Sequence, residues 1–273
     1  MPNLKVVMIG DVMGDAGLKV LEERLPGFFR ESKPDFCMVN GENSAAGFGV
    51  NPETVGRILA LGVDIITSGN HIWEKRDHWS LLDTEERLLR PANYPVGNPG
   101  KGWIKVEKEI NGQKRTFLAI NLQGRDFMTP IDCPFKTFDE IESAAGLSPA
   151  DQKPAQEKPL ILVDFHAEST REKEALGFYL DGRACVVAGT HTHVQTADEK
   201  ILPKGTAYIS DLGMTGILDA VIGMDSETCI QRSKNQVLYR MEAAQNGHEV
   251  RIQGIIVEIE ADGRAVSIQR INL

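Results

Sequence analysis

The sequence lacks the long apolar runs and paired cysteines that mark several common classes of protein. No stretch approaches the ~18 apolar residues of a membrane-spanning helix, and the N-terminal run MPNLKVVMIGDV is short for a signal peptide and is interrupted by Asp11. The four cysteines lie far apart and form no C-x-x-C pair. We therefore expect a cytoplasmic protein with reduced thiols, without a disulfide framework, a cysteine zinc site or a membrane anchor.

Basic blocks and aromatic side chains are also scarce. The formal net charge is −9 and aromatic residues make up 6% of the chain. A long nucleic acid is not an expected ligand, because binding to a phosphate backbone needs a positive surface. A small phosphorylated substrate remains compatible with this charge, because bound metal cations reverse the local field.

The sequence does contain a series of short apolar runs. They alternate with stretches in which apolar residues recur with the period of an α-helix. With 273 residues and 41% hydrophobic content, the chain can form one large domain or two small ones. The runs predict buried strands at 4–9, 36–39, 63–67, 160–165, 185–188 and 206–209. Alternation of this kind favours a layered α/β fold with largely parallel strands.

Local signals predict where several helices begin and end. A leucine stripe at 18, 21 and 25 marks a helix that Pro26 must kink or restart. A second helix over 52–61 is closed by Gly62. The pair Ser169 and Glu172 has the spacing of a capping box that opens a third helix.

Two hairpins interrupt the alternation of strands and helices. One joins 103–109 to 115–120 through Asn111-Gly112, and the other joins 250–260 to 265–271 through Asp262-Gly263. Antiparallel strands therefore join the sheets, which argues against a pure Rossmann layout. The Pro-rich polar segment 148–159 is interpreted as a surface excursion.

Polar side chains follow five of the predicted strands at the point where each strand ends. They occur in Gly10-Asp11, Asn40-Gly41-Glu42-Asn43, Ser68-Gly69-Asn70-His71, Asp164-Phe165-His166 and Gly189-Thr190-His191-Thr192-His193. The carboxyl edge of an open α/β sheet is where ligands bind. Four of the six histidines fall in this set, and the whole set indicates a metal site.

The pair His191 and His193 is a weak signal by itself. An extended segment points residues i and i+2 to the same side, so both imidazoles can face one point in space. A polar turn with two solvated histidines is the alternative. Other single residues also have structural alternatives: Asp11 as a helix N-cap, Asn43 in an Asx-turn, and His71 as a structural histidine. Near His166, Glu168 is interpreted as a turn residue and Asp164 as a hydrogen-bond partner of a ligand.

The order of these polar motifs along the chain resembles that of the calcineurin-like metallophosphoesterases. The order is Asp, then an acidic residue, then Gly-Asn-His, then His, then His-x-His. The chain is more closely similar to the bacterial YmdB-like phosphodiesterase branch, through N-G-E-N at 40–43 and G-T-H-T-H at 189–193. DFHAE, GFYLDGR and GTHTHVQTADE also match that branch. The resemblance covers nearly the whole chain and implies a sandwich of two mixed β-sheets flanked by helices, as a single domain over residues 1–273.

The resemblance also implies two metal ions held side by side. Asp11, Glu42, Asn43 and His193 would hold the first, and Glu42 would bridge to the second, completed by Asn70, His166 and His191. A carboxylate suits the bridge because its two oxygens can serve two cations ~3.5–4 Å apart. The implied metals are manganese or iron, in divalent or trivalent form, and the N and O ligands leave zinc open.

Met13 departs from the wider superfamily, which places a ligating histidine there. A thioether is a poor ligand for hard divalent ions. We therefore expect Met13 to contribute packing, which leaves open whether it affects the first metal site.

These observations predict a binuclear metal-dependent phosphodiesterase in which a metal-bridging hydroxide attacks phosphorus. The resemblance implies small phosphodiesters, 2′,3′-cyclic nucleotides among them, as substrates, and it raises the expectation of a homo-oligomer. His71 follows a ligand residue, so its ring can reach the leaving group as the general acid. Two alternatives remain: a phosphomonoesterase at the same site, and a regulatory nucleotide-binding protein with little turnover. The presence of His71 argues against the second, since binding alone needs no acid.

Overall fold

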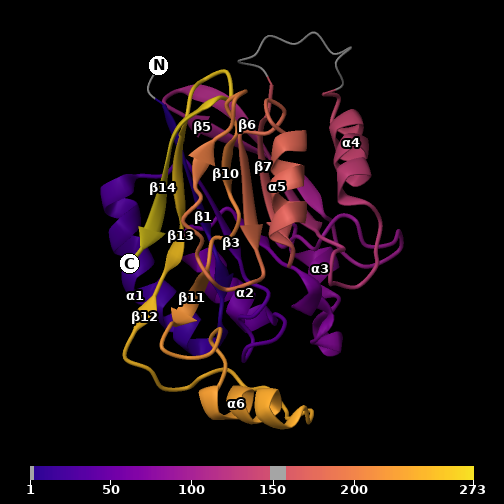
Figure 1. Cartoon of the computed structure of the whole chain (residues 1–273). Coiled ribbons are helices and arrows are strands. Elements are labelled where there is room, and N and C mark those ends of the chain that lie inside the picture. Colours follow the sequence, from indigo (N-terminus) through magenta and orange to yellow (C-terminus); the bar gives the residue numbers. More distant parts are fainter. Residues whose placement is uncertain (1–2, 148–157) are drawn as a thin grey trace.

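The computed structural model describes residues 3–147 and 158–273, and Figure 1 shows two β-sheets stacked between helices. The first sheet has the strand order β14-β13-β1-β3-β4. In that order its strands are Ala265–Asn272, Gln253–Ile259, Leu4–Ile9, Phe36–Asn40 and Ile65–Thr67. Strands β1, β3 and β4 run parallel, whereas β13 pairs antiparallel with both of its neighbours.

The second sheet has the order β5-β6-β7-β8-β10-β9. Its strands are Trp103–Ile110, Gln113–Gln123, Leu160–His166, Val186–Thr190, Ala207–Ile209 and Lys200–Ile201. The four central strands are parallel, and β5 and β9 pair antiparallel at the edges. Both sheets are therefore mixed, as the sequence predicts. A small third sheet, which the sequence patterns do not reveal, joins β12 (Val250–Arg251), β11 (Met214–Ile217) and β2 (Asp11–Val12).

Helices cover the outer face of each large sheet. On the first sheet these are α1 (Gly14–Ser32) and α2 (Pro52–Ala60), and on the second α4 (Pro134–Ala144) and α5 (Thr170–Tyr179). The remaining short elements are η1 (Asn70–Trp73), η2 (Arg76–His78), α3 (Leu81–Thr84) and the outlying α6 (Ser226–Asn235). This arrangement confirms the expected sandwich of two mixed β-sheets flanked by helices.

Burial on both faces explains why the strands are nearly continuous apolar runs. Along β1, Val6 and Met8 pack into the core between the two sheets, while Val7 and Ile9 pack under the helices of the first sheet. All four side chains are at most 1% exposed. A strand alternates its side chains between two faces, so both sets of positions must be apolar when both faces are covered.

Of the two outcomes predicted at Pro26, a kink or a restart of the helix, the structure excludes the restart. Helix α1 continues through Pro26 without restarting. Leu18, Leu21 and Leu25 are buried on its sheet-facing side. Packing of this stripe outweighs the one backbone hydrogen bond that proline removes, which the local sequence alone does not predict.

The predicted capping box at α5 is half formed. Ser169 accepts a hydrogen bond from the backbone N–H of Glu172 at 3.3 Å, as expected for an N-cap. The Glu172 carboxylate instead accepts the backbone N–H groups of Arg125 and Asp126 in the loop after β6. The Glu172 carboxylate therefore makes a tertiary contact in place of the local hydrogen bond that would complete the capping box.

Strand boundaries otherwise shift by at most three residues, the largest shift being at the end of β6, and one predicted strand is divided. The stretch predicted at 250–260 is split at Ile252, because β12 joins the small third sheet and β13 joins the first. Of the predicted excursion at 148–159, only the last two residues are among the described ones. No helix in the described part of the chain is long and apolar enough to cross a membrane.

Candidate metal centre

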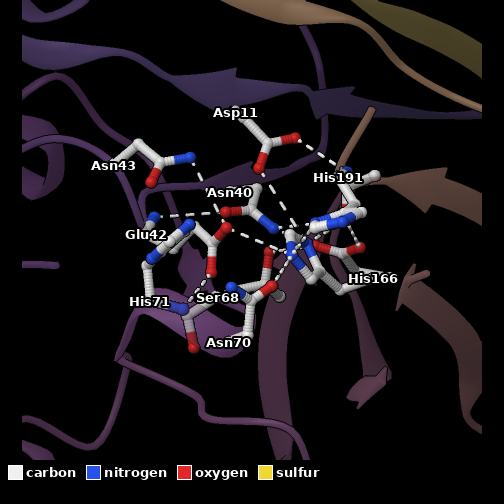
Figure 2. A network of polar contacts seen from close by, with 12 residues as sticks. Asp11, Asn40, Glu42, Asn43, Ser68, Asn70, His71, His166 and His191 are labelled. Atoms are coloured by element: carbon white, nitrogen blue, oxygen red, sulfur yellow. Dashed lines mark hydrogen bonds and ion pairs between the residues drawn. The ribbon is translucent and has the colours of Figure 1, made fainter. Parts of the chain in front are cut away.

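The ends of strands from different sheets bring together all the residues that the sequence singles out for metal binding and acid catalysis, and Figure 2 labels all of them except His193. They come from β2, the turn after β3, η1 after β4, the last residue of β7 and the loop after β8. These residues are Asp11, Glu42, Asn43, Asn70, His71, His166, His191 and His193.

On one side of the site, three polar atoms surround a single nitrogen of His166. Its Nε2 lies 3.1 Å from Asn70 Oδ1, 3.1 Å from Glu42 Oε1 and 3.0 Å from His191 Nδ1. One ring nitrogen offers one proton or one lone pair, so it cannot satisfy three such partners. Ligand atoms of Glu42, His166 and His191 all lie within 4.8 Å of one another, close enough for all three to bind one metal ion.

On the other side, Glu42, Asn43, Asp11 and His193 converge. His193 Nε2 lies 3.2 Å from Asn43 Nδ2 and 3.9 Å from Asp11 Oδ1, and Asn43 Nδ2 lies 3.4 Å from Glu42 Oε1. Among the described residues, the buried oxygens Asp11 Oδ1 and Asn43 Oδ1 have no hydrogen-bond partner. Rotation of the Asn43 amide would turn its oxygen toward His193 and Glu42.

The donor set therefore fits metal ions. Buried oxygens without partners are costly unless a cation or another donor satisfies them. Carboxylate, amide and imidazole groups without any thiolate suit metals such as manganese and iron.

Burial and neighbouring charges shift the ionisation of the central groups. Burial raises the pKa of Asp11 to about 6, against the lowering effect of His193 and His166. Burial acts in the same direction on Glu42, but His166 and His71 outweigh it and bring the pKa of Glu42 down to about 2. Burial opposes charge on His166, yet Glu42 and Asp11 raise the pKa of His166 to about 9. The pKa of His191 falls to about 3 through burial and the charge of His166. The site favours positive charge beside Glu42.

The two histidines of the H-x-H pair reach the site through a loop conformation, not through strand alternation. Strand β8 ends before them, and both have left-handed backbones, with φ of 104° at His191 and 64° at His193. Asp211 holds the turn: its Oδ2 accepts the backbone N–H of Thr192 at 3.1 Å and the Thr192 hydroxyl at 2.8 Å. Such backbones cost about 1–3 kcal/mol each and persist only where surrounding contacts hold them. The two rings face neighbouring points instead of one.

His71 lies at the edge of the cluster, beside Glu42 (Figure 2). Its backbone N–H donates to Glu42 Oε2 at 3.0 Å, and its ring packs edge-on against Phe48, with 5.1 Å between the centroids. The approach of η1 to the site depends on Gly69, because a Cβ there would clash with the His166 ring. The backbone of His71 thus supports Glu42 while its ring stays outside the set of convergent ligand atoms.

Glu168 lies in the bend between β7 and α5, as predicted, and makes an additional contact, whereas Asp11 differs from the structural alternative considered for it. Glu168 Oε2 lies 3.1 Å from His191 Nε2, so this residue contacts a site histidine directly. Asp11 is not the N-cap of α1, because Met13 occupies that position without a side-chain hydrogen bond.

Met13 packs in an apolar cluster and is 2% exposed. Its neighbours there include Met214, Met224 and Ala243. The expected packing role is consistent with this environment.

We expect Met13→Leu to leave the metal content of the protein unchanged. Leucine keeps the apolar volume and removes the sulfur, and swaps of this kind cost less than about 1.5 kcal/mol. Elemental analysis and thermal denaturation check this. Loss of metal without loss of folding would show that the thioether contributes to the site.

Four buried polar residues that are not candidate ligands lie close to His166, and the sequence analysis assigns a role to Asp164 alone. Asn40, Thr67, Asp164 and Thr190 form a buried hydrogen-bonded group below His166. Their one sequence signal is position, because each lies at or near the end of a site strand. Asn40, Asp164 and Thr190 lie within the quoted motifs, but only the structure shows which atoms they contact.

Comparisons with known proteins agree with this geometry. A model of the family described as "YmdB-like protein" matches residues 7–271. A Bacillus subtilis protein named 2′,3′-cyclic-nucleotide 2′-phosphodiesterase is 44% identical over 269 residues, which cover 98% of this chain and 96% of that protein. A solved structure of a Thermus thermophilus protein, described as hypothetical, has a TM-score of 0.86 at 37% identity and covers 99% of each chain. A phosphatase structure from Mycoplasma pneumoniae has a TM-score of 0.87 at 29% identity, covering 100% of this chain and 94% of that one.

Proposed function

Because this chain belongs to the YmdB-like family, we propose that it hydrolyses small phosphodiesters, 2′,3′-cyclic nucleotides among them, with the aid of two bound metal ions. The chain is a hydrolase of the phosphoesterase kind, in line with relatives named phosphodiesterase and phosphatase. The observation that carries the proposal is the convergence of two ligand groups on either side of Glu42.

We assign the ligands from these contacts. Asp11, Glu42, Asn43 and His193 would hold one ion, and Glu42, Asn70, His166 and His191 the other. Glu42 makes the shorter contacts with both groups, 3.4 Å to Asn43 Nδ2 and 3.1 Å to His166 Nε2, whereas Asp11 Oδ1 lies 3.9 Å from His193 Nε2 and from His166 Nδ1. Manganese and iron fit the donors best, with zinc as a further candidate. When bound, such ions would activate a water molecule near neutral pH and neutralise charge on the phosphate oxygens.

The protein's own residues would complete the reaction. His71 is the general acid in this proposal, and its ring would donate a proton to the departing ester oxygen. Its Nδ1 lies 3.5 Å from Glu74 Oε1, which leaves Nε2 as the donor to substrate. The hydrogen bond from the His71 backbone to Glu42 fixes the distance between this acid and the metal ligands.

Product analysis with manganese tests the proposal. We expect cleavage of bis-p-nitrophenyl phosphate and of a 2′,3′-cyclic nucleotide, the latter giving the 3′-phosphate if the bond to O2′ breaks. His191→Ala, which removes a proposed ligand, should abolish both activities. Cleavage of p-nitrophenyl phosphate alone would identify a phosphomonoesterase. Tight nucleotide binding with no turnover on any substrate would identify a binding protein.

A further inference from the structure

In His166, His191 and His193, one ring nitrogen faces the candidate ligand atoms of the site. The other ring nitrogen faces a polar group outside that set. His193 Nδ1 faces the carbonyl oxygen of Ile222 at 2.8 Å, and His191 Nε2 faces the Glu168 carboxylate at 3.1 Å. An ionised carboxylate and a carbonyl only accept hydrogen bonds, so the nitrogens facing them carry protons. The third histidine, His166, has a different kind of partner.

His166 Nδ1 faces the hydroxyl of Thr190 at 3.0 Å. A hydroxyl can donate or accept, so this contact alone does not decide which nitrogen keeps its proton in the neutral form of His166 that binds a metal. The choice matters because a neutral imidazole offers a metal only the nitrogen that lacks a proton.

The other neighbours of Thr190 Oγ1 decide the direction of this hydrogen bond. Asn40 Nδ2 lies 3.3 Å away, and Asp164 Oδ1 lies 2.7 Å away. The Asn40 amide is oriented by the backbone N–H of Glu42, which donates to its Oδ1 at 3.1 Å, so its nitrogen must be the group that faces Thr190. An amide nitrogen donates only, which leaves Asp164 as the acceptor for the single hydroxyl proton.

Asp164 is suited to accept the hydrogen bond from the Thr190 hydroxyl. It is 1% exposed and accepts hydrogen bonds from three side chains: Asn40, Thr67 and Thr190. Hydrogen bonds to an ionised oxygen are short and roughly twice as strong as neutral ones. With its proton on Asp164, Thr190 can only accept from His166 Nδ1–H.

We propose that Asp164 and Thr190 are positioning residues that fix the tautomer of His166, keeping the proton on Nδ1 and the Nε2 lone pair toward the second metal ion. This inference rests on the proposed metal-dependent function. It assigns Asn40 and Thr67 the task of orienting Asp164, which accounts for their burial beneath the site.

Zinc titration of threonine variants tests this role. Thr190→Val keeps the shape and removes the hydroxyl, so zinc affinity at one site should fall about 10- to 100-fold, as for other partners of ligating histidines. Thr190→Ser should restore it. Thr215→Val is the matched control, because Thr215 Oγ1 is buried and has no hydrogen-bond partner among the described residues. The zinc affinity of the Thr215→Val protein, measured by chelator competition, should equal that of the parent.

Parent-like zinc affinity in a folded Thr190→Val protein would overturn the inference and leave the proposed function intact. A parent protein that binds no metal would overturn the proposed function itself. If Thr190→Val does not fold, nitrogen-15 NMR of the zinc-loaded parent gives the answer directly. A proton on His166 Nδ1 with zinc on Nε2 supports the inference, and zinc on Nδ1 contradicts it.

Discussion

In a His71→Ala variant, we expect kcat on phosphodiesters with alkoxide leaving groups to fall about 10²- to 10⁴-fold, the usual contribution of a positioned proton donor. Metal content should stay at the parent level. The reason is geometric: the His71 ring lies outside the convergent ligand atoms, and the backbone N–H that supports Glu42 remains in alanine. Steady-state kinetics and elemental analysis of the same preparation measure both quantities.

The leaving group provides the sharper control for this variant. Loss of activity should shrink for bis-p-nitrophenyl phosphate, because p-nitrophenolate departs without protonation. His191→Ala should instead lose metal and activity together on every substrate. His248→Ala, a change at an exposed histidine, should match the parent. If His71→Ala loses metal as His191→Ala does, or slows both leaving groups equally, His71 is not the acid.

A Glu42→Gln protein should be purified with most of its metal missing. Glutamine keeps the shape of this buried side chain and removes the negative charge between the two ligand groups. We expect the affinity of the protein for metal to fall by more than about 100-fold. That is the upper end of the loss seen when a hydrogen-bond partner of a metal ligand is removed. Metal content by elemental analysis and competition with a chelator check this. Two ions per chain in the variant would exclude Glu42 as the bridge.

Glu172→Gln is the matched control for that experiment. Glu172 is also a buried carboxylate, 7% exposed, but it accepts two backbone N–H groups of a loop. Its replacement should lower the free energy of unfolding by about 1–3 kcal/mol, the cost of an imperfectly satisfied buried group. Its metal content should equal the parent's.

The fold was predictable from the sequence wherever local patterns and burial agree. The apolar runs became buried strands because both faces of each sheet are covered. The patterns misplaced the features that tertiary contacts control. Glu172 binds a distant loop instead of its own cap, and the first strand of the last hairpin is divided at Ile252. In each case a contact between segments far apart in the chain outweighs a local preference.

Motif residues at the strand ends of the candidate site were also predictable, because parallel strands end at one edge of their sheet. The conformation that brings them together was not. His191 and His193 converge through left-handed backbones that Asp211 holds, and extended geometry would not have produced this turn. Likewise, only the structure shows that Glu168 contacts His191.

By itself, the sequence determined the alternation of strands and helices and the chemical types of side chain at the strand ends, since both are set by residue order and periodicity. Tertiary structure alone decided which atoms of those side chains face one another. The proton on His166 illustrates the difference: the direction of its hydrogen bond depends on Thr190, Asp164 and Asn40, which come from three different strands. Hydrogen-bond direction depends on angles and distances between groups remote in sequence, and no spacing along the chain encodes them.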